Sequence, residues 1–230
     1  MGSLTAARRN DVLALATNEF VDLDWQVWLV PAVDTPESRP QRLDWNLDPT
    51  LLPGYFVGDA PALSWVGASG DVDGDGRDEA IWVMPRIDLE HCAILVIGSV
   101  PGSATIGMRT TVELDEPCVR ADLILADADN DGRIDVALLT GSTRGAARKL
   151  LVLWNEGEGR FSNASLARLN PDADSPEAFT FLPPIPGRTS AFAYVTATSM
   201  AMVKGEGRRQ FGAPHVLANI TQGRRPIAID

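Results

Sequence analysis

Two nine-residue segments of the chain are rich in acidic side chains and repeat one pattern. Residues 71–79 read Asp-Val-Asp-Gly-Asp-Gly-Arg-Asp-Glu, and residues 127–135 read Asp-Ala-Asp-Asn-Asp-Gly-Arg-Ile-Asp. Each segment has carboxylates at positions 1, 3, 5 and 9 and a glycine at position 6. Carboxylate oxygens that converge within a tight loop are the ligands that Ca²⁺ prefers, and glycine permits the sharp turn that such a loop needs.

The pattern therefore predicts two Ca²⁺ sites. Without a cation the clustered carboxylates would repel, because two unit charges 4 Å apart cost about 4 kcal/mol at an effective dielectric constant of 20. A solvated acidic turn is the alternative, since Asp and Gly are common in turns. The expected ligands are the side chains of Asp71, Asp73, Asp75, Glu79, Asp127, Asp129, Asp131 and Asp135 and the backbone carbonyls of Arg77 and Arg133.

Each loop is expected to join two β-strands. Residues 79–84 and 135–139 follow the loops as short apolar runs, and residues 121–126 precede the second loop in the same way. Such runs are typical of buried strands. An EF-hand would need a glutamate at position 12 and a helix on both sides. Position 12 is Trp82 in one loop and Leu138 in the other, so the sequence disfavours an EF-hand.

The acidic loops belong to a longer internal repeat. Gly-Arg pairs that begin at residues 76, 132 and 187 each precede an apolar stretch, at spacings of 56 and 55 residues. A second marker, an apolar strand followed by a Gly-rich turn and a phenylalanine, occurs at residues 151–161 and again at 199–211. A repeat of this length indicates a propeller or a solenoid.

These features resemble the FG-GAP/VCBS repeat family, which forms integrin-α-like β-propellers. The resemblance rests on the strand–Asp-x-Asp-x-Asp-Gly–strand unit, the turn at residues 155–161 and the Phe-Gly-Ala-Pro segment at 211–214, and it covers roughly residues 60–230. It implies an all-β fold of four-stranded blades, with Ca²⁺ bound in a hairpin loop of the blade. It also implies a non-catalytic module for extracellular recognition, adhesion or scaffolding, with a protein or carbohydrate ligand.

Two alternatives to that function stay open. Some polysaccharide lyases share the architecture, so the chain could be the propeller portion of a polysaccharide-active enzyme. It could also be a self-assembling subunit, because an incomplete ring exposes strand edges that pair with another copy. The chain has only two histidines, His91 and His215, in unrelated contexts, and no catalytic constellation is expected.

The chain departs from the family pattern in two places. The third repeat has Leu182, Pro184, Pro186 and Ser190 at the ligand positions, so no metal is expected there. The chain ends at Asp230, about where a further loop would begin. We therefore expect one propeller domain or segment of about four blade equivalents, with approximate units 1–60, 61–117, 118–170 and 171–230. It would form either a closed four-blade ring or part of a larger, seven-blade ring.

The net charge and the distribution of apolar residues exclude some classes of binding partner. The formal net charge of −11 argues against nucleic acid, which needs a basic face. No apolar run reaches the length of about 18 residues that a membrane-spanning helix requires. The first residues do not resemble a signal peptide. An extracellular, cell-surface or periplasmic location is what the family resemblance implies.

Three further features lead to expectations about packing. Cys92 and Cys118 could form a disulfide, as in secreted proteins, or two buried thiols. Residues 34–54 and 170–187 hold four and five prolines and are predicted as long connections. Four tryptophans crowd the first third of the chain, where packing between blades is favoured over a sugar-binding platform. They are Trp25, Trp28, Trp45 and Trp65.

Overall fold

The regular structure of the chain is almost entirely β-strand. The computed structural model describes residues 12–17, 25–30, 39–43, 50, 54–57, 60–64, 66–99, 106–142, 147–171, 175–185, 189–207 and 209–220. Within these residues the exception to β-structure is one turn of 3₁₀ helix at Asn163–Ser165. The predicted all-β class is therefore confirmed.

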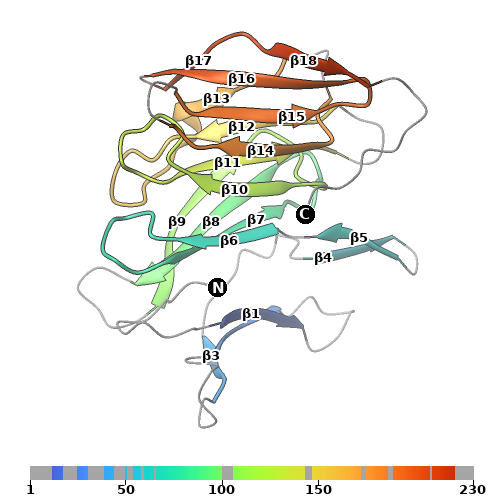
Figure 1. Ribbon diagram of the computed structural model, residues 1–230. Helices are drawn as coiled ribbons and strands as arrows, with labels where there is room; N and C mark the ends of the chain where they lie inside the picture. Colours follow the sequence, from blue (N-terminus) through green and yellow to red (C-terminus); the bar gives the residue numbers. More distant parts are fainter. Residues whose placement is uncertain are drawn as a thin grey trace.

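Three antiparallel sheets follow one another along the chain, and within each the strands pair mainly with their sequence neighbours (Figure 1). Sheet A contains β6 (Val66–Gly70), β7 (Glu79–Pro85), β8 (Cys92–Ser99) and β9 (Ile106–Leu114). Sheet B contains β10 (Asp122–Ala126), β11 (Asp135–Thr140), β12 (Lys149–Leu153) and β13 (Leu166–Arg168). Sheet C contains β14 (Ala178–Leu182), β15 (Ala191–Val195), β16 (Ser199–Gly207), β17 (Gln210–Phe211) and β18 (His215–Asn219).

Smaller elements precede these sheets. A three-stranded sheet contains β1 (Val12–Thr17), β2 (Trp25–Val30) and β3 (Gln41–Leu43), and a separate hairpin contains β4 (Gly54–Val57) and β5 (Ala60–Ser64). Two of the clustered tryptophans, Trp45 and Trp65, lie outside the described residues.

The two proline-rich segments are not the uninterrupted connections that were predicted. The short strand β3 forms within residues 34–54, and β14 forms within residues 170–187. The prolines that flank β14 stand outside its paired residues. The strand itself reads Ala-Phe-Thr-Phe-Leu, and its alternation suits a half-buried strand. The prediction of a long connection relied on the number of prolines and did not take this alternation into account.

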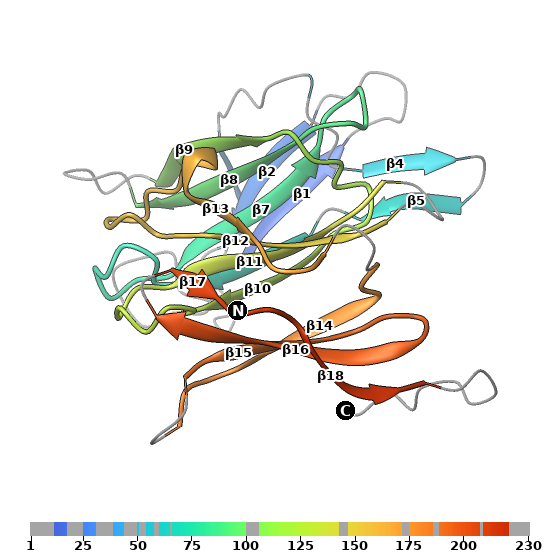
Figure 2. The same ribbon diagram turned by 90° about the horizontal axis from the view of Figure 1, so that it is seen from above.

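The sheets pack face to face (Figure 2). Three clusters of buried apolar side chains fill the layers between them. Strand β7 shows why: Ala80, Trp82 and Met84 face the N-terminal sheet, and Ile81 and Val83 face sheet B. Successive side chains of a strand point to opposite faces, so a strand covered on both sides must be apolar at nearly every position. The same holds for β8 and β11, which explains the continuous apolar runs in the sequence.

The layer between sheets B and C leaves one face of sheet C uncovered by the described residues. Phe179 and Phe181 of β14, with Phe192 of β15, point into that layer. On the opposite face the alternation places Leu182 and Met200, which are 41% and 39% exposed. Sheet C is therefore apolar on both faces, although the described chain packs against only one of them.

A disulfide joins Cys92 and Cys118, so the first of the two predicted alternatives is found. Cys92 begins β8 in sheet A, and Cys118 lies in the segment that leads to β10 in sheet B. Both residues are buried in the layer between the two sheets. The bond therefore fixes sheet A to the entry of sheet B.

Candidate metal centres

The two acidic loops occupy equivalent places in neighbouring sheets. The first connects β6 to β7, and the second connects β10 to β11. The inner strands β6, β10 and β14 lie beside one another, which brings the connecting loops to one end of the sheets (Figure 1). The predicted strand–loop–strand arrangement is confirmed for both segments.

Position 1 organises each loop through backbone hydrogen bonds. Asp71 accepts hydrogen bonds from the amides of Gly74 (2.8 Å) and Gly76 (3.0 Å). Asp127 accepts from the amides of Asp131 (3.0 Å) and Gly132 (2.9 Å). In each loop the amide of the position-6 glycine is thus bound to the first carboxylate, which bends the chain around that side chain.

The chain reverses in the loops through residues with positive φ. Position 4 is Gly74 (φ 80°) in one loop and Asn130 (φ 61°) in the other, and position 6 is Gly76 (φ 84°) or Gly132 (φ 86°). Glycine and asparagine are the residues that adopt this left-handed conformation most readily. The residue types at positions 4 and 6 are therefore those that the fold of the loop requires.

Positions 3 and 5 repeat a second hydrogen-bond pattern. Asp73 accepts from the amide of Asp75 (3.0 Å), and Asp75 accepts from the amide of Arg77 (2.9 Å). The second loop has the same two bonds, at 3.1 Å from Asp131 to Asp129 and at 2.9 Å from Arg133 to Asp131. The two loops therefore share their internal geometry as well as their sequence pattern.

The position-9 acids, Glu79 and Asp135, are buried at the first residue of β7 and β11. Glu79 accepts a hydrogen bond from the amide of Val72 (3.1 Å), and Asp135 accepts one from the amide of Ala128 (2.9 Å). Burial, together with the Asp73 carboxylate, raises the pKa of Glu79 to about 7. Burial likewise raises the pKa of Asp135 to about 7. The surroundings of each site therefore do not fully stabilise the ionised position-9 carboxylate, and a bound cation would supply the missing stabilisation.

Both loops pass a distance test for a bound cation. The side chains at positions 1, 3 and 9 offer carboxylate oxygens that lie within 4.8 Å of one another in each loop. Oxygens bonded to one Ca²⁺ at about 2.4 Å can be no farther apart than about twice that distance. Two clusters that could hold a metal ion are therefore present: Asp71, Asp73 and Glu79, and Asp127, Asp129 and Asp135.

The other predicted ligands lie on the same loops but outside these two groups. Asp75 and Asp131 each accept a hydrogen bond from the amide at position 7. The side chain of Arg133 donates to the carbonyl of Asn155 (3.3 Å) and lies 3.7 Å from Asp131. Ligation by Asp75 and Asp131, and by the carbonyls of Arg77 and Arg133, stays a prediction.

The third repeat uses its position-9 residue differently. Ser190 is buried, and its hydroxyl donates to the carbonyl of Ala128 (2.5 Å), which is position 2 of the second loop. Leu182 ends β14 as an exposed side chain, and Pro186 lies outside the described residues. Ser190 thus connects sheet C to the loop of sheet B.

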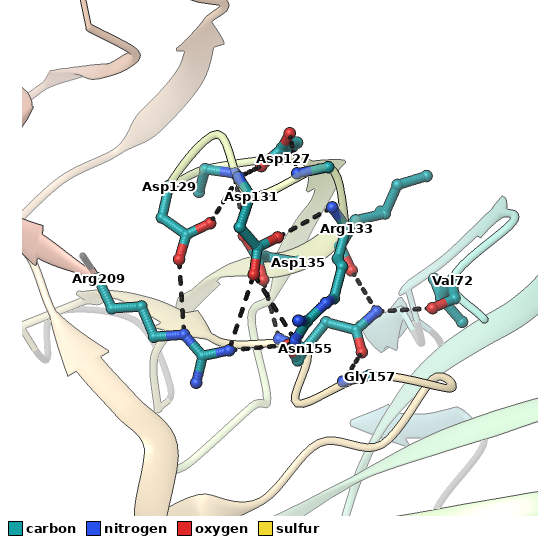
Figure 3. Close-up of polar contacts among 12 residues, drawn as sticks. Val72, Asp127, Asp129, Asp131, Arg133, Asp135, Asn155, Gly157 and Arg209 are labelled. Carbon is teal, nitrogen blue, oxygen red and sulfur yellow. Dashed lines mark hydrogen bonds and ion pairs between the residues drawn. The ribbon is translucent and has the colours of Figure 1, made fainter. Parts of the chain in front are cut away.

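Asn155 is a residue that the ligand pattern missed. It is fully buried two residues after the end of β12, and its side-chain amide donates to the carbonyls of Val72 (2.6 Å) and Ile134 (3.0 Å). Its backbone amide donates to the carboxylate of Asp135 (2.8 Å), and its side-chain oxygen accepts from the amide of Gly157 (2.9 Å) (Figure 3). Asn155 therefore contacts both acidic loops. Asn155 lies within the Gly-rich marker at residues 151–161, but that marker gave no indication of its contacts with the loops.

Two arginines outside the loops were also missed. Arg109 of β9 pairs with Asp73 and lies 3.5 Å from Glu79. Arg209 of sheet C lies 3.5 Å from Asp129 and 4.0 Å from Asp131. Each cluster thus has a guanidinium beside its position-3 aspartate. No sequence signal linked these arginines to the loops, because 36 residues separate Arg109 from Asp73 and Arg209 lies in another repeat.

Comparison with known proteins finds no family model that matches the chain and no matching curated protein. In the part of the chain that the structure describes, no helix is long and apolar enough to cross a membrane. The assignment of function therefore depends on the geometry of the two loops and on the sheets that hold them.

Proposed function

We propose that the chain is a Ca²⁺-binding β-propeller segment of the FG-GAP/VCBS type, which serves extracellular recognition, adhesion or scaffolding without catalysing a reaction. The observation that carries the proposal is the equivalence of the two acidic loops. Both connect the first two strands of a four-stranded sheet, and both bring carboxylates at positions 1, 3 and 9 within 4.8 Å.

The arrangement of the sheets supports a propeller. Three antiparallel sheets follow in chain order, pack face to face and place their first strands beside one another. None of the described sheets closes on itself, and two of them have the four antiparallel strands of a propeller blade. Blades of this kind stack around an axis, and loops at one end then form a common surface.

The donor chemistry favours Ca²⁺. The two clusters consist of carboxylates alone, without histidine or cysteine, and hard oxygen donors suit Ca²⁺ or Mg²⁺ rather than zinc or copper. Ca²⁺ accepts irregular coordination by several protein oxygens, whereas Mg²⁺ demands near-octahedral geometry and retains waters. A bound ion would join the start of each loop to the first residue of the following strand, which is a structural role.

The disulfide supports an extracellular setting. Disulfides persist in oxidising compartments and are rare in the cytosol. Extracellular Ca²⁺ modules bind with dissociation constants of about 10⁻⁴–10⁻³ M, so a weak two-site module is filled outside the cell. The buried bond between Cys92 and Cys118 and the two acidic clusters are consistent with the same environment.

Calorimetric titration of the metal-free protein with CaCl₂ tests the metal assignment. We expect two equivalents to bind to the unaltered protein, and one to Asp71→Asn or Asp127→Asn, because each substitution removes a charged ligand from one loop. Asp78→Asn is the matched control, since Asp78 lies in the first loop but outside its cluster. Equal binding by all four proteins, or no binding by the unaltered protein, would contradict the assignment.

A second candidate, self-assembly, is favoured by the uncovered face of sheet C. Of the seven large apolar side chains that are exposed in the described chain, five lie between residues 182 and 217. Leu182 and Met200 among them lie on the uncovered face of sheet C, and large exposed apolar patches mark interaction surfaces. Light scattering coupled to gel filtration tests this candidate. We expect the unaltered protein to have the mass of an oligomer and the Met200→Glu variant to have the mass of a monomer. A monomeric unaltered protein would exclude it.

A further inference from the structure

The two acidic clusters are paired with arginines that come from different sheets. Arg109 is on β9 of sheet A, the sheet that also carries the first loop. Arg209 precedes β17 of sheet C, whereas the second loop belongs to sheet B. The cation beside the second cluster is therefore supplied across the boundary between two sheets (Figure 3).

Several contacts hold the Arg209 guanidinium beside the second cluster. It donates a hydrogen bond of 2.9 Å to the carbonyl of Asn155 and lies over the ring of Trp154, 5.9 Å from its centroid. Its backbone has φ 63°, in the left-handed region that side chains other than glycine and asparagine rarely adopt. Such strain persists where the surrounding contacts determine the conformation. The turn thus presents the side chain to sheet B.

The carboxylate of Asp129 is the point where Arg209 and a metal ion would compete. Its Oδ1 accepts a hydrogen bond from the amide of Asp131, and its Oδ2 lies 3.5 Å from the Arg209 guanidinium. Asp129 is also one of the three carboxylates that could hold the ion. A guanidinium and a divalent cation at neighbouring positions repel each other and use the same negative charge.

We propose that Arg209 is an internal cation which competes with the metal ion for the second acidic loop. Binding of the ion releases Arg209 from Asp129 and Asp131 and so loosens the contact between sheet C and sheet B. The metal content of the second loop thereby regulates how firmly sheet C is held. This inference rests on the metal binding proposed above. By linkage, whatever strengthens the Arg209 contact weakens the binding of the ion by the same factor.

The first loop supplies an internal comparison. Arg109 lies on β9 of sheet A, and it also donates to the carbonyl of Glu158 at 3.4 Å, in the segment between β12 and β13 of sheet B. Release of Arg109 from Asp73 would therefore leave the boundary between sheets B and C unchanged. Metal binding at the first loop is therefore expected to leave the contact between sheets B and C unchanged, although the two loops have the same internal geometry.

The competition is tested in a chain whose first loop is disabled by Asp71→Asn and Asp73→Asn, so that CaCl₂ binds only at the second loop. Arg209→Gln in this background keeps a polar stem and removes the charge. We expect it to tighten Ca²⁺ binding by about tenfold, within the usual range of coupling between sites, and Arg209→Lys to give a smaller change. Unchanged or weaker binding in Arg209→Gln overturns the proposal.

Hydrogen exchange measures the second consequence without any change at Arg209. In the same background, CaCl₂ should accelerate amide exchange in residues 205–211, and MgCl₂ at equal ionic strength should not. Unchanged or slower exchange on saturation with CaCl₂ overturns the proposal even if Arg209→Gln does not fold. If the unaltered protein binds no Ca²⁺, the proposed function is wrong as well. If it binds two Ca²⁺ ions but shows neither the change in affinity nor the faster exchange, only the proposed competition is wrong.

Discussion

The side-chain amide of Asn155 donates a 2.6 Å hydrogen bond to the main-chain carbonyl of Val72, across the boundary between sheets B and A. Val72 is the second residue of the first acidic loop, and its amide donates to the Glu79 carboxylate. The backbone amide of Asn155 donates to Asp135 of the second loop. One buried residue therefore touches a position-9 acid directly in one loop and through Val72 in the other.

Loss of the Asn155 side chain should destabilise the protein by about 2–4 kcal/mol, because it leaves the buried carbonyl of Val72 and the half-buried carbonyl of Ile134 without their donor. Asn155→Ala should also weaken Ca²⁺ binding at both loops. Urea unfolding and calorimetry measure the two effects. Asn163→Ala is the control, since Asn163 is exposed in the 3₁₀ turn. Equal stability of the two variants would contradict a connecting role.

Ca²⁺ should stabilise the fold by mass action. At a free concentration about 20-fold above the dissociation constant, each occupied site adds roughly 1.8 kcal/mol. Asp73→Ala or Asp129→Ala should therefore lower the melting temperature more in Ca²⁺ than in chelator, where only the contacts with Arg109 or Arg209 and the loop amides are lost. Differential scanning calorimetry with and without chelator measures the difference. The same loss of stability in chelator would show that these aspartates act without the metal.

The metal-free protein should become less stable as the pH rises. Burial raises the pKa of Glu79 from its ordinary value of 4.5 to about 7. Between those two values the folded state binds more protons than the unfolded state, so stability falls with increasing pH and the loss is complete above about pH 7. Asp135 behaves in the same way, from 3.8 to about 7.

Thermal unfolding of the chelator-treated protein at pH 5.5 and pH 8 measures this effect. Glu79→Gln retains a side chain that can accept from the Val72 amide but does not titrate, so its melting temperature should change less between the two pH values. Saturating Ca²⁺ at pH 8 should restore the stability of the unaltered protein. Identical pH dependence of the variant and the unaltered protein would rule out a contribution from Glu79.

Reduction of the disulfide should cost about 3 kcal/mol of stability, as expected for the loop between Cys92 and Cys118, which are 26 residues apart. Urea unfolding with and without reductant measures it. The Cys92→Ser/Cys118→Ser double variant should show no effect of reductant. Titration of two free thiols in the denatured, unreduced protein would contradict the bond.

Sequence reasoning was most successful where the interactions are local. All the internal hydrogen bonds of the acidic loops join residues that are at most seven apart, so a nine-residue pattern contains most of the site. The strands β7 and β11 were predicted because both of their faces are buried, which leaves an apolar run in the sequence. Strand β14 was not predicted, because the prolines on both sides of it indicated a loop and its alternating pattern covers only five residues.

The remaining features depend on contacts between residues far apart in the chain. Asn155 reaches Val72 across 83 positions, and Arg209 reaches a loop in the preceding repeat. Nothing in the local sequence distinguishes these side chains from other asparagines and arginines. The pairing of Cys92 with Cys118 was undecided for the same reason, since it required the packing of sheet A against sheet B.

The order of residues along the chain was sufficient to define the acidic loops, their turns and the strands beside them, because each of these forms from neighbouring residues. The packing of the sheets settled which charges meet. It placed Arg109 and Arg209 beside Asp73 and Asp129 and buried Asn155 between the loops. Opposite charges attract only at short range in water, so these pairs exist because the apolar layers bring distant segments together.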